Sequence, residues 1–331
     1  MNSEQLAWRI RRHGIEMTHL SCGSHIGAIM SVADIIAVLY ADVLKYKPKE
    51  PEWEGRDRFI LSKGHAGASI YAALAEEGFF PVGELVTHYQ NGSRLSGHVS
   101  HHLPGVDFST GSLGHGLSAG CGMAYAAKKD GVTDHRVFVV LGDGECNEGS
   151  VWEAALFANH FRLNNLVAVV DHNRMQSMDF NENTLEIEDF ASKWRAFGWN
   201  AVEVNGNDHD ELREAFEKAA SFDNHKPTVV IADTVKGFGV SFMQNNILWH
   251  YRFPHDGWEY DRAVSELHGN MPEGVTDPYT PDGTPRSDIE DPGLGYAFTE
   301  TWEPSYPENM RRVFAEPGTA EPVRGISEVD Q

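Results

Sequence analysis

Short runs of valine, isoleucine and leucine recur along this chain, with helical patterns between them. The clearest apolar runs are RVFVVLGD (136–143), LVAVVDHN (166–173) and PTVVIADT (227–234). Around them lie the helical stretches GLSAGCGMAYAAKK (116–129), VWEAALFANHF (151–161) and DELREAFEKAASF (210–222). Strands that are apolar on both faces and alternate with helices are typical of a parallel sheet covered on both sides. The sequence therefore predicts an α/β, doubly wound, mainly parallel sheet with helices on both faces.

The first hundred residues fit the same class. Helical patterns cover Leu6–Leu20 and Ser31–Leu44, and RFILSKGHAGASIYAALAEEG (58–78) begins as a short strand and turns into a helix. The composition changes after residue 270, because residues 271–331 hold 9 of the 15 prolines and no lysine. We therefore expect a folded domain over residues 1–270 and an extended, Pro-rich acidic extension over residues 271–331.

Charge and composition exclude some classes of function. The formal net charge of −22 repels phosphate backbones and anionic membranes, so we expect neither nucleic acid nor a membrane as a partner. No continuous apolar run reaches about 18 residues, and the N-terminus has no secretory leader pattern. Cys22, Cys121 and Cys146 are odd in number and lack the spacing of a metal site. These features predict a reduced, cytoplasmic protein.

Two oxygen-bearing side chains stand at strand ends. Asp143 ends one apolar run and Asn173 ends the next. Ligands of parallel α/β sheets bind beyond the carboxyl ends of the strands, and Mg²⁺ prefers oxygen ligands together with substrate phosphates. Gly142 and Gly144 would let backbone amides approach an anion. A tight Asp-Gly turn without a ligand remains an alternative for Asp143 alone.

Specific motifs resemble those of thiamine diphosphate enzymes. GDG (142–144) is followed after 28 residues by Asn173, as in the thiamine diphosphate signature. GSHIGAIMSVADIIAVLY, FILSKGHAGASIYAAL, LSGHVSHHLPGVDFSTGSLGHGLSAGCGMAYAAK and TVKGFGVSFMQNNILWH resemble, in that order, the N-terminal half of transketolase. The resemblance covers about residues 5–270. It implies the N-terminal subunit of a split transketolase, which transfers a two-carbon ketol unit from a ketose to an aldose.

The resemblance also assigns expected roles to residues. Asp143, Asn173 and the backbone oxygen of Met175 would hold Mg²⁺, and Gly144 would contact the diphosphate. Glu148 would couple two cofactor sites across a subunit interface. The remaining matches fall on segments that line thiamine diphosphate or the substrate: Gly111, Ser112 and Leu113 along the cofactor, His65, His98 and His250 near cofactor and substrate oxygens, and His25 at the substrate end.

The resemblance predicts a partner as well. In transketolases a glutamate of the pyrimidine-binding domain activates the aminopyrimidine ring of the cofactor. Residues next to the metal loop lie at the diphosphate end, so neither Glu145 nor Glu148 can take that role. We therefore expect a separate C-terminal subunit, with the pyrimidine-binding and C-terminal domains, in an α₂β₂ assembly.

Some positions depart from the family pattern. Ser24 stands where the family has a glycine before the first histidine, and Tyr251 stands where a glycine commonly follows Trp-His. The departures lie at the sugar end, so the donor and acceptor stay open: a sugar phosphate, a sulfosugar or a modified sugar. Two other functions compete with the transketolase hypothesis. One is an α-type subunit of a 2-oxoacid dehydrogenase, and the other is a non-catalytic cofactor-binding partner.

Overall fold

The computed structural model describes residues 1–131, 135–187, 189–221, 224–280 and 283–286. Internal contacts group Met1–Leu294 into one compact unit. Most of the predicted Pro-rich extension, residues 287–331, lies outside the described residues.

A five-stranded parallel sheet forms the centre of this unit. Its strands are β1 (Arg58–Leu61), β2 (Val137–Gly142), β3 (Leu166–His172), β4 (Asn200–Asn205) and β5 (Thr228–Asp233). They lie in the order β1-β2-β3-β5-β4, and every neighbouring pair is parallel. The predicted α/β class is therefore confirmed. Because β2 and β3 are neighbours, their carboxyl ends deliver Asp143 and Asn173 to one edge of the sheet.

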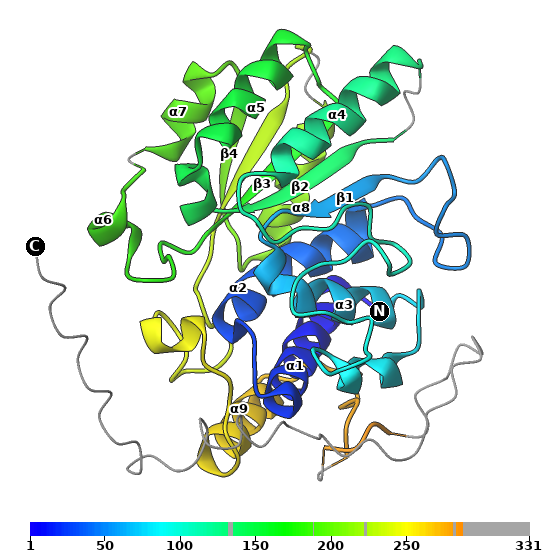
Figure 1. The fold of residues 1–331 in the computed structure, drawn as a ribbon, viewed down its shortest axis with the longest axis vertical. Coiled ribbons are helices and arrows are strands. Elements are labelled where there is room, and N and C mark those ends of the chain that lie inside the picture. The colour runs from blue at the N-terminus through cyan, green and yellow to red at the C-terminus, as the bar shows by residue number, and fades with distance from the viewer. Residues whose placement is uncertain (132–134, 188, 222–223, 281–282, 287–331) are drawn as a thin grey trace, which may run out of the picture. The chain divides into compact units, whose positions relative to one another are not determined.

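Helices cover both faces of the sheet (Figure 1). On one side lie α4 (Gly116–Lys129), α5 (Gly149–His160) and α7 (Phe190–Ala196). On the other lie α1 (Ser3–Ser21), α2 (Ile26–Val38), α3 (Gly67–Glu76) and α8 (His209–Ser221). Alternate residues of β2 feed the two cores: Val139 packs with the α4 and α5 side, and Val140 packs with the α2 and α3 side. This is why the strand reads as a continuous apolar run.

One further helix, α9, and several short helical turns complete the described chain. They are α6 (Asn181–Thr184), α9 (Trp258–Gly269), the π-helical turn η1 (Leu39–Val43) and the 3₁₀ turns η2 (Gly64–Ala66), η3 (Val82–Thr87), η4 (Gly144–Asn147) and η5 (Ile247–His250). Helix α9 packs on α1 through a third apolar cluster that contains Trp8, Trp249 and Leu267.

One helical stretch has the length and apolar composition of a membrane span. It is Ile26–Val43, and 83% of this stretch is buried inside the protein. Helix α2 packs against α1, α3 and α8, so its apolar surface is used within the fold. We interpret it as a core helix.

The described part of the predicted extension packs against α1. The side chain of Gln5 donates to the carbonyl of Glu273 at 2.9 Å, and Arg12 donates to Asp277 at 3.0 Å. His13 and the hydroxyl of Tyr279 lie 2.7 Å apart, and Tyr279 is 4% exposed. Residues 273–279 therefore pack onto the compact unit, with Pro278 and Tyr279 buried.

Candidate functional site

One pocket of about 250 Å³ opens at the carboxyl ends of the strands. It brings together most of the residues that the sequence singled out, from seven separate stretches of chain. The predicted residues that line it are His25, His65, His98, Gly111, Leu113, Asp143, Gly144, Asn173, Met175 and His250. Ser112 and Glu148 do not line it; both side chains are exposed, and Glu148 is the N-cap residue of α5.

Asp143 is a buried residue of the pocket wall. It follows β2 directly and is 2% exposed. Its carboxylate accepts the amide of Gly144 at 2.7 Å and the side-chain amide of Asn181 at 2.9 Å. Burial raises the pKa of Asp143, and the nearby charge of Asp171 raises it further. An acid whose charge is disfavoured in the absence of a cation is well suited to receive one.

Asn173 and Met175 reach the same place from the end of β3. Asn173 is 4% exposed and Met175 is 2% exposed. Arg174 between them has a φ of 63°, in the left-handed region. That turn lets the amide of Met175 donate to the side-chain oxygen of Asn173 at 3.1 Å. The strained backbone at Arg174 therefore places two oxygen atoms that can bind a metal on the pocket wall. They are the side-chain oxygen of Asn173 and the carbonyl oxygen of Met175.

A buried ion pair lies beneath these oxygens. The ammonium of Lys63 contacts the carboxylate of Asp171, and both side chains are at most 1% exposed. Asp171 also accepts the hydroxyls of Ser31, at 2.7 Å, and Thr234. Burial opposes its charge, but Lys63 and these hydrogen bonds together lower the pKa of Asp171. Asp171 is therefore ionised, and it fixes Lys63 at the pocket.

Lys236 supplies a second positive charge. It is 3% exposed, lines the pocket and donates to the carbonyl of Met175 at 3.3 Å. The hydrogen bond that the Lys236 ammonium makes in the described chain thus goes to a neutral carbonyl and not to a carboxylate. Burial lowers the pKa of Lys236 to about 8, and the charge of Lys63 contributes to this shift. A pocket with two buried lysines is matched to an anion such as a diphosphate.

Four histidines form the outer part of the pocket. The ring centroid of His25 lies 5.0 Å from that of His65, 6.0 Å from His98 and 5.6 Å from His250. Burial lowers the pKa of His25 to about 4 and that of His250 to about 3, with nearby cationic groups contributing. Burial also places the pKa of His65 well below its ordinary value. These three imidazoles are therefore neutral near pH 7 and available to accept or donate protons.

A buried carboxyl group ties the glycine loops together. Glu145 accepts the hydroxyl of Ser62, the amide of Gly114 at 2.9 Å and the amide of Gly142 at 3.0 Å. The end of β1, the loop before α4 and the end of β2 thus meet at one side chain. Burial raises the pKa of Glu145. Because Gly111 and Leu113 belong to the same loop, Glu145 sets the shape of the wall they form.

The donor set fits a metal-bound diphosphate. Asp143, Asn173 and the Met175 carbonyl present the oxygen atoms that Mg²⁺ prefers, and Lys63 and Lys236 supply positive charge. The Nδ1 atoms of His25 and His250 are buried without a hydrogen-bond partner in the described chain. Buried polar atoms of this kind require a partner, which a bound ligand can supply. Among the described residues, no three His, Cys, Asp or Glu side chains gather around one point as the ligands of a metal ion would. An ion held by one carboxylate, one amide and one carbonyl does not need such a cluster.

Comparisons with known proteins identify the family. The family model "Transketolase, thiamine diphosphate binding domain" matches residues 3–251. The chain belongs to this family. It is 38% identical over 257 residues to an apulose-4-phosphate transketolase subunit of Phocaeicola vulgatus, covering 78% of this chain and 90% of the relative. It is 39% identical over 245 residues to the 6-deoxy-6-sulfo-D-fructose transketolase subunit SqwG of a Clostridium strain, covering 73% and 88%.

A solved transketolase shares the fold. The transketolase of Leishmania mexicana superposes with a TM-score of 0.75 at 29% identity, over 81% of this chain and 41% of that one. The chain thus spans about two fifths of that transketolase. The transketolase match favours the transketolase hypothesis over the 2-oxoacid dehydrogenase alternative. Thiamine diphosphate is the cofactor of this domain family.

Several residues of this transketolase site were not predicted from the sequence. Lys63 and Lys236 lie inside motifs that resemble transketolase, but the resemblance assigned neither lysine a role. Their position in the sequence could have indicated a role in binding, because each lysine follows the end of a parallel strand and precedes a glycine. Glu145 and Asp171 carry no such signal, since their function depends on contacts with Ser62 and Lys63 that lie far away in sequence.

Ser24 offers a test of the site's backbone. Its φ is 93°, where side chains are unfavourable, and its hydroxyl is buried without a partner in the described chain. The backbone at Ser24 thus keeps a left-handed conformation, which explains why the family has a glycine at this position. We predict that Ser24→Gly raises the free energy of unfolding by about 1 kcal/mol, measured in urea. Ser21→Gly, in the last turn of α1, serves as the control and should not stabilise the protein. A destabilised Ser24→Gly variant would contradict the assigned strain.

The neutral histidines predict a pH dependence of stability. Because the pKa of His25 is lowered to about 4 in the folded state, the unfolded chain binds a proton first as pH falls below about 6.5. This contribution is fully present above pH 6.5 and is lost as pH falls toward 4. We predict that His25→Asn reduces the loss of unfolding free energy between pH 7 and pH 4.5 by on the order of 1 kcal/mol. Equal losses in both proteins, measured by urea titration, would refute the neutral assignment.

Proposed function

We propose that this chain is the cofactor-binding subunit of a two-subunit transketolase. It acts with Mg²⁺ and thiamine diphosphate to transfer a two-carbon ketol unit from a ketose to an aldose. The observation that supports this most is the meeting of Asp143, Asn173 and Met175 with Lys63 and Lys236 in one pocket. The family match and two relatives named as transketolase subunits support the same function.

The chain's own residues divide into two groups along the pocket. At the inner end, Asp143, Asn173 and the Met175 carbonyl would hold the metal, and the two lysines would bind the diphosphate. When bound, thiamine diphosphate would supply the nucleophilic carbanion for ketol transfer. At the outer end, the neutral imidazoles of His25, His65 and His250, together with His98, orient substrate oxygens. They also move protons to and from substrate hydroxyl groups.

A second polypeptide completes the site in this proposal. Two relatives named as apulose-4-phosphate transketolase subunits match over about nine tenths of their own length, and those names imply a partner chain for them. Within the described chain, the carboxyl groups that line the pocket are Asp143 and Glu145, and both flank Gly144 beside the proposed metal ligands. The carboxylate that activates the aminopyrimidine would therefore come from the partner. We propose an α₂β₂ assembly, with exposed Glu148 at the interface between two sites.

The substrate and compartment also belong to the proposal. One relative's name specifies apulose 4-phosphate and another's specifies 6-deoxy-6-sulfo-D-fructose. Both names denote a ketose with an anionic group, and we propose a donor of that general class. We place the reaction in the cytoplasm, because the three cysteines are free and two of them, Cys121 and Cys146, are buried.

The assignment of Asp143 as a metal ligand predicts that its substitution weakens cofactor binding without lowering the free energy of unfolding. Asp143→Asn should weaken Mg²⁺-dependent binding of thiamine diphosphate by at least about 100-fold, since it removes the charged ligand. The free energy of unfolding should not fall, because burial and Asp171 already disfavour the charge at this position. Isothermal titration with and without Mg²⁺ measures the affinity. Asp179→Asn, in the loop after β3 and outside the pocket, is the control. Unchanged Mg²⁺-dependent binding in Asp143→Asn would refute the assignment.

The partner assignment predicts that this chain alone is catalytically silent. Without the partner's carboxylate, exchange of the C2 proton of thiamine diphosphate should stay at the rate seen in solution. Addition of the C-terminal subunit should accelerate it by several orders of magnitude, as expected for a missing acid–base group. Proton NMR after acid quenching in D₂O measures the exchange. Fast exchange by the purified chain with Mg²⁺ alone would show that the site is already complete.

A further inference from the structure

The backbone around Lys236 has no regular secondary structure of its own. It follows β5 and includes Gly237, with a φ of 82°, and Gly239, with a φ of 99°. A Cβ on Gly237 would lie 2.4 Å from the carbonyl oxygen of Met243, so the chain packs tightly at this point. Lys236 is buried and carries the charge that faces the pocket. Groups elsewhere in the fold must therefore hold this segment, residues 234–239, in place.

One face of α2 contacts this segment directly at Gly27 and reaches it through shared partners at Ser31 and Asp34. The carbonyl of Gly27 accepts the amide of Gly237 at 3.1 Å. Ser31 donates to Asp171, which also accepts the hydroxyl of Thr234. The next position on this face, seven residues after Gly27, is Asp34. Residues at spacings of four and seven share a face of a helix, so the direct contact and the two bridged ones lie on one face of α2.

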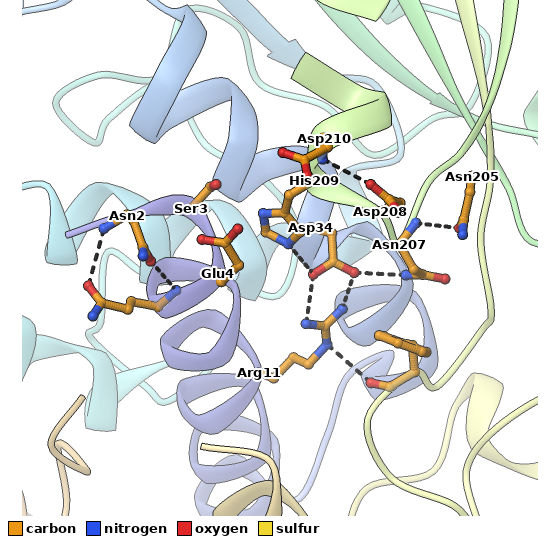
Figure 2. A network of polar contacts seen from close by, with 12 residues as sticks. Asn2, Ser3, Glu4, Arg11, Asp34, Asn205, Asn207, Asp208, His209 and Asp210 are labelled. Carbon is orange, nitrogen blue, oxygen red and sulfur yellow. Dashed lines mark hydrogen bonds and ion pairs between the residues drawn. The ribbon is translucent and has the colours of Figure 1, made fainter. Parts of the chain in front are cut away.

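Asp34 is the centre of a buried polar network (Figure 2). It accepts two hydrogen bonds from the guanidinium of Arg11, at 2.9 and 2.6 Å. It also accepts the side-chain amide of Asn207 at 2.8 Å and contacts Nε2 of His209 at 3.1 Å. Burial alone would raise the pKa of Asp34, but Arg11 and His209 together lower it to about 2. The aspartate is thus a charged acceptor with four fixed contacts.

The partners of Asp34 hold the 234–239 segment on both sides of Lys236. Asn207 accepts the backbone amide of Val235 at 3.1 Å. Arg11 donates through Nε to the carbonyl of Phe238 at 3.1 Å, and its guanidinium lies 4.9 Å from the Phe238 ring centroid. One side-chain amide and one guanidinium therefore fix the residues flanking Lys236 and Gly237. Asp34 orients both groups, although it does not line the pocket.

We propose that Asp34 is a positioning residue for the diphosphate site. Through Arg11 and Asn207 it fixes the backbone of residues 234–239 and so aims Lys236 at the diphosphate. The diphosphate part of this inference rests on the proposed function, whereas the control of the backbone does not. A merely stabilising ion pair would lower stability without changing the local order of this segment or the affinity of the folded protein.

The chain contains a matched control for this distinction. Asp107 accepts two hydrogen bonds from the guanidinium of Arg56, at 2.9 and 2.6 Å, and its side chain is likewise buried. It also accepts the amide of Phe59, in β1, and it does not line the pocket. Asp107→Asn thus disrupts a bidentate pair of the same geometry without touching residues 234–239. The comparison of Asp34→Asn with Asp107→Asn therefore separates the loss of a buried ion pair in general from the loss of the pair that holds residues 234–239.

The experiment uses the full chain and two readouts. Amide hydrogen exchange is measured without ligand on peptides covering residues 234–245. Binding of Mg²⁺ and inorganic pyrophosphate is measured by calorimetry on the folded fraction. In Asp34→Asn we expect the amides of Val235 and Gly237 to exchange at least about tenfold faster. We also expect pyrophosphate affinity to fall by about 10- to 100-fold, as for other groups that orient a ligand's contacts. Asp107→Asn should change neither.

Each outcome decides one claim. Unchanged exchange in Asp34→Asn, or equal acceleration in Asp107→Asn, overturns the positioning role. Accelerated exchange with wild-type pyrophosphate affinity overturns the aiming of Lys236. If the wild type does not bind pyrophosphate but exchange is accelerated in Asp34→Asn, the proposed diphosphate site is wrong. The role of Asp34 in fixing the backbone of residues 234–239 is then still supported. Should Asp34→Asn not fold, Asn207→Ala keeps the Arg11 pair and removes the acceptor of Val235. Its control is Asn200→Ala, at the other end of β4, and the same outcomes decide the claim.

Discussion

The ion pair between Lys63 and Asp171 is the interaction on which the rest of the site depends. Two fully buried charges are costly to desolvate, and they persist only when their remaining hydrogen-bonding capacity is satisfied. Ser31 and Thr234 satisfy Asp171, and this brings α2, β3 and the end of β5 together at one point. The same carboxylate raises the pKa of Asp143. The pair therefore fixes the Lys63 ammonium at the pocket and disfavours the charge of Asp143 in the absence of a cation.

Around this pair, the parallel sheet does most of the positioning. Lys63, Asp143, Asn173 and Lys236 each follow the end of a different strand, β1, β2, β3 and β5. The four strands are consecutive in the sheet, so the side chains converge although they lie up to 173 positions apart in sequence. The four histidines lie in loops and short turns beside this edge of the sheet. The fold thus separates a rigid, charged inner end from an outer end lined by imidazoles.

The apolar runs made much of this arrangement predictable. They indicated β2, β3 and β5 and therefore the convergence of Asp143 with Asn173. Strand β4 was missed because NAVEVN lies at the edge of the sheet, where half-exposed side chains remove the apolar signal. The roles of Lys63, Glu145 and Asp171 depend on contacts between segments far apart in sequence, which no local pattern encodes. The family resemblance placed Ser112 near the cofactor, and the structure leaves it outside the pocket.

In the proposed function, the ends of β2 and β3 hold a metal-bound diphosphate. This can be tested by a crystal structure of the chain with thiamine diphosphate and Mn²⁺, phased on the manganese anomalous signal. We expect one metal peak about 2.1–2.4 Å from Asp143, Asn173 and the Met175 carbonyl, with Lys236 moved from that carbonyl to a phosphate oxygen. A metal or diphosphate bound elsewhere, with Asp143 still held only by its amide donors, would contradict it.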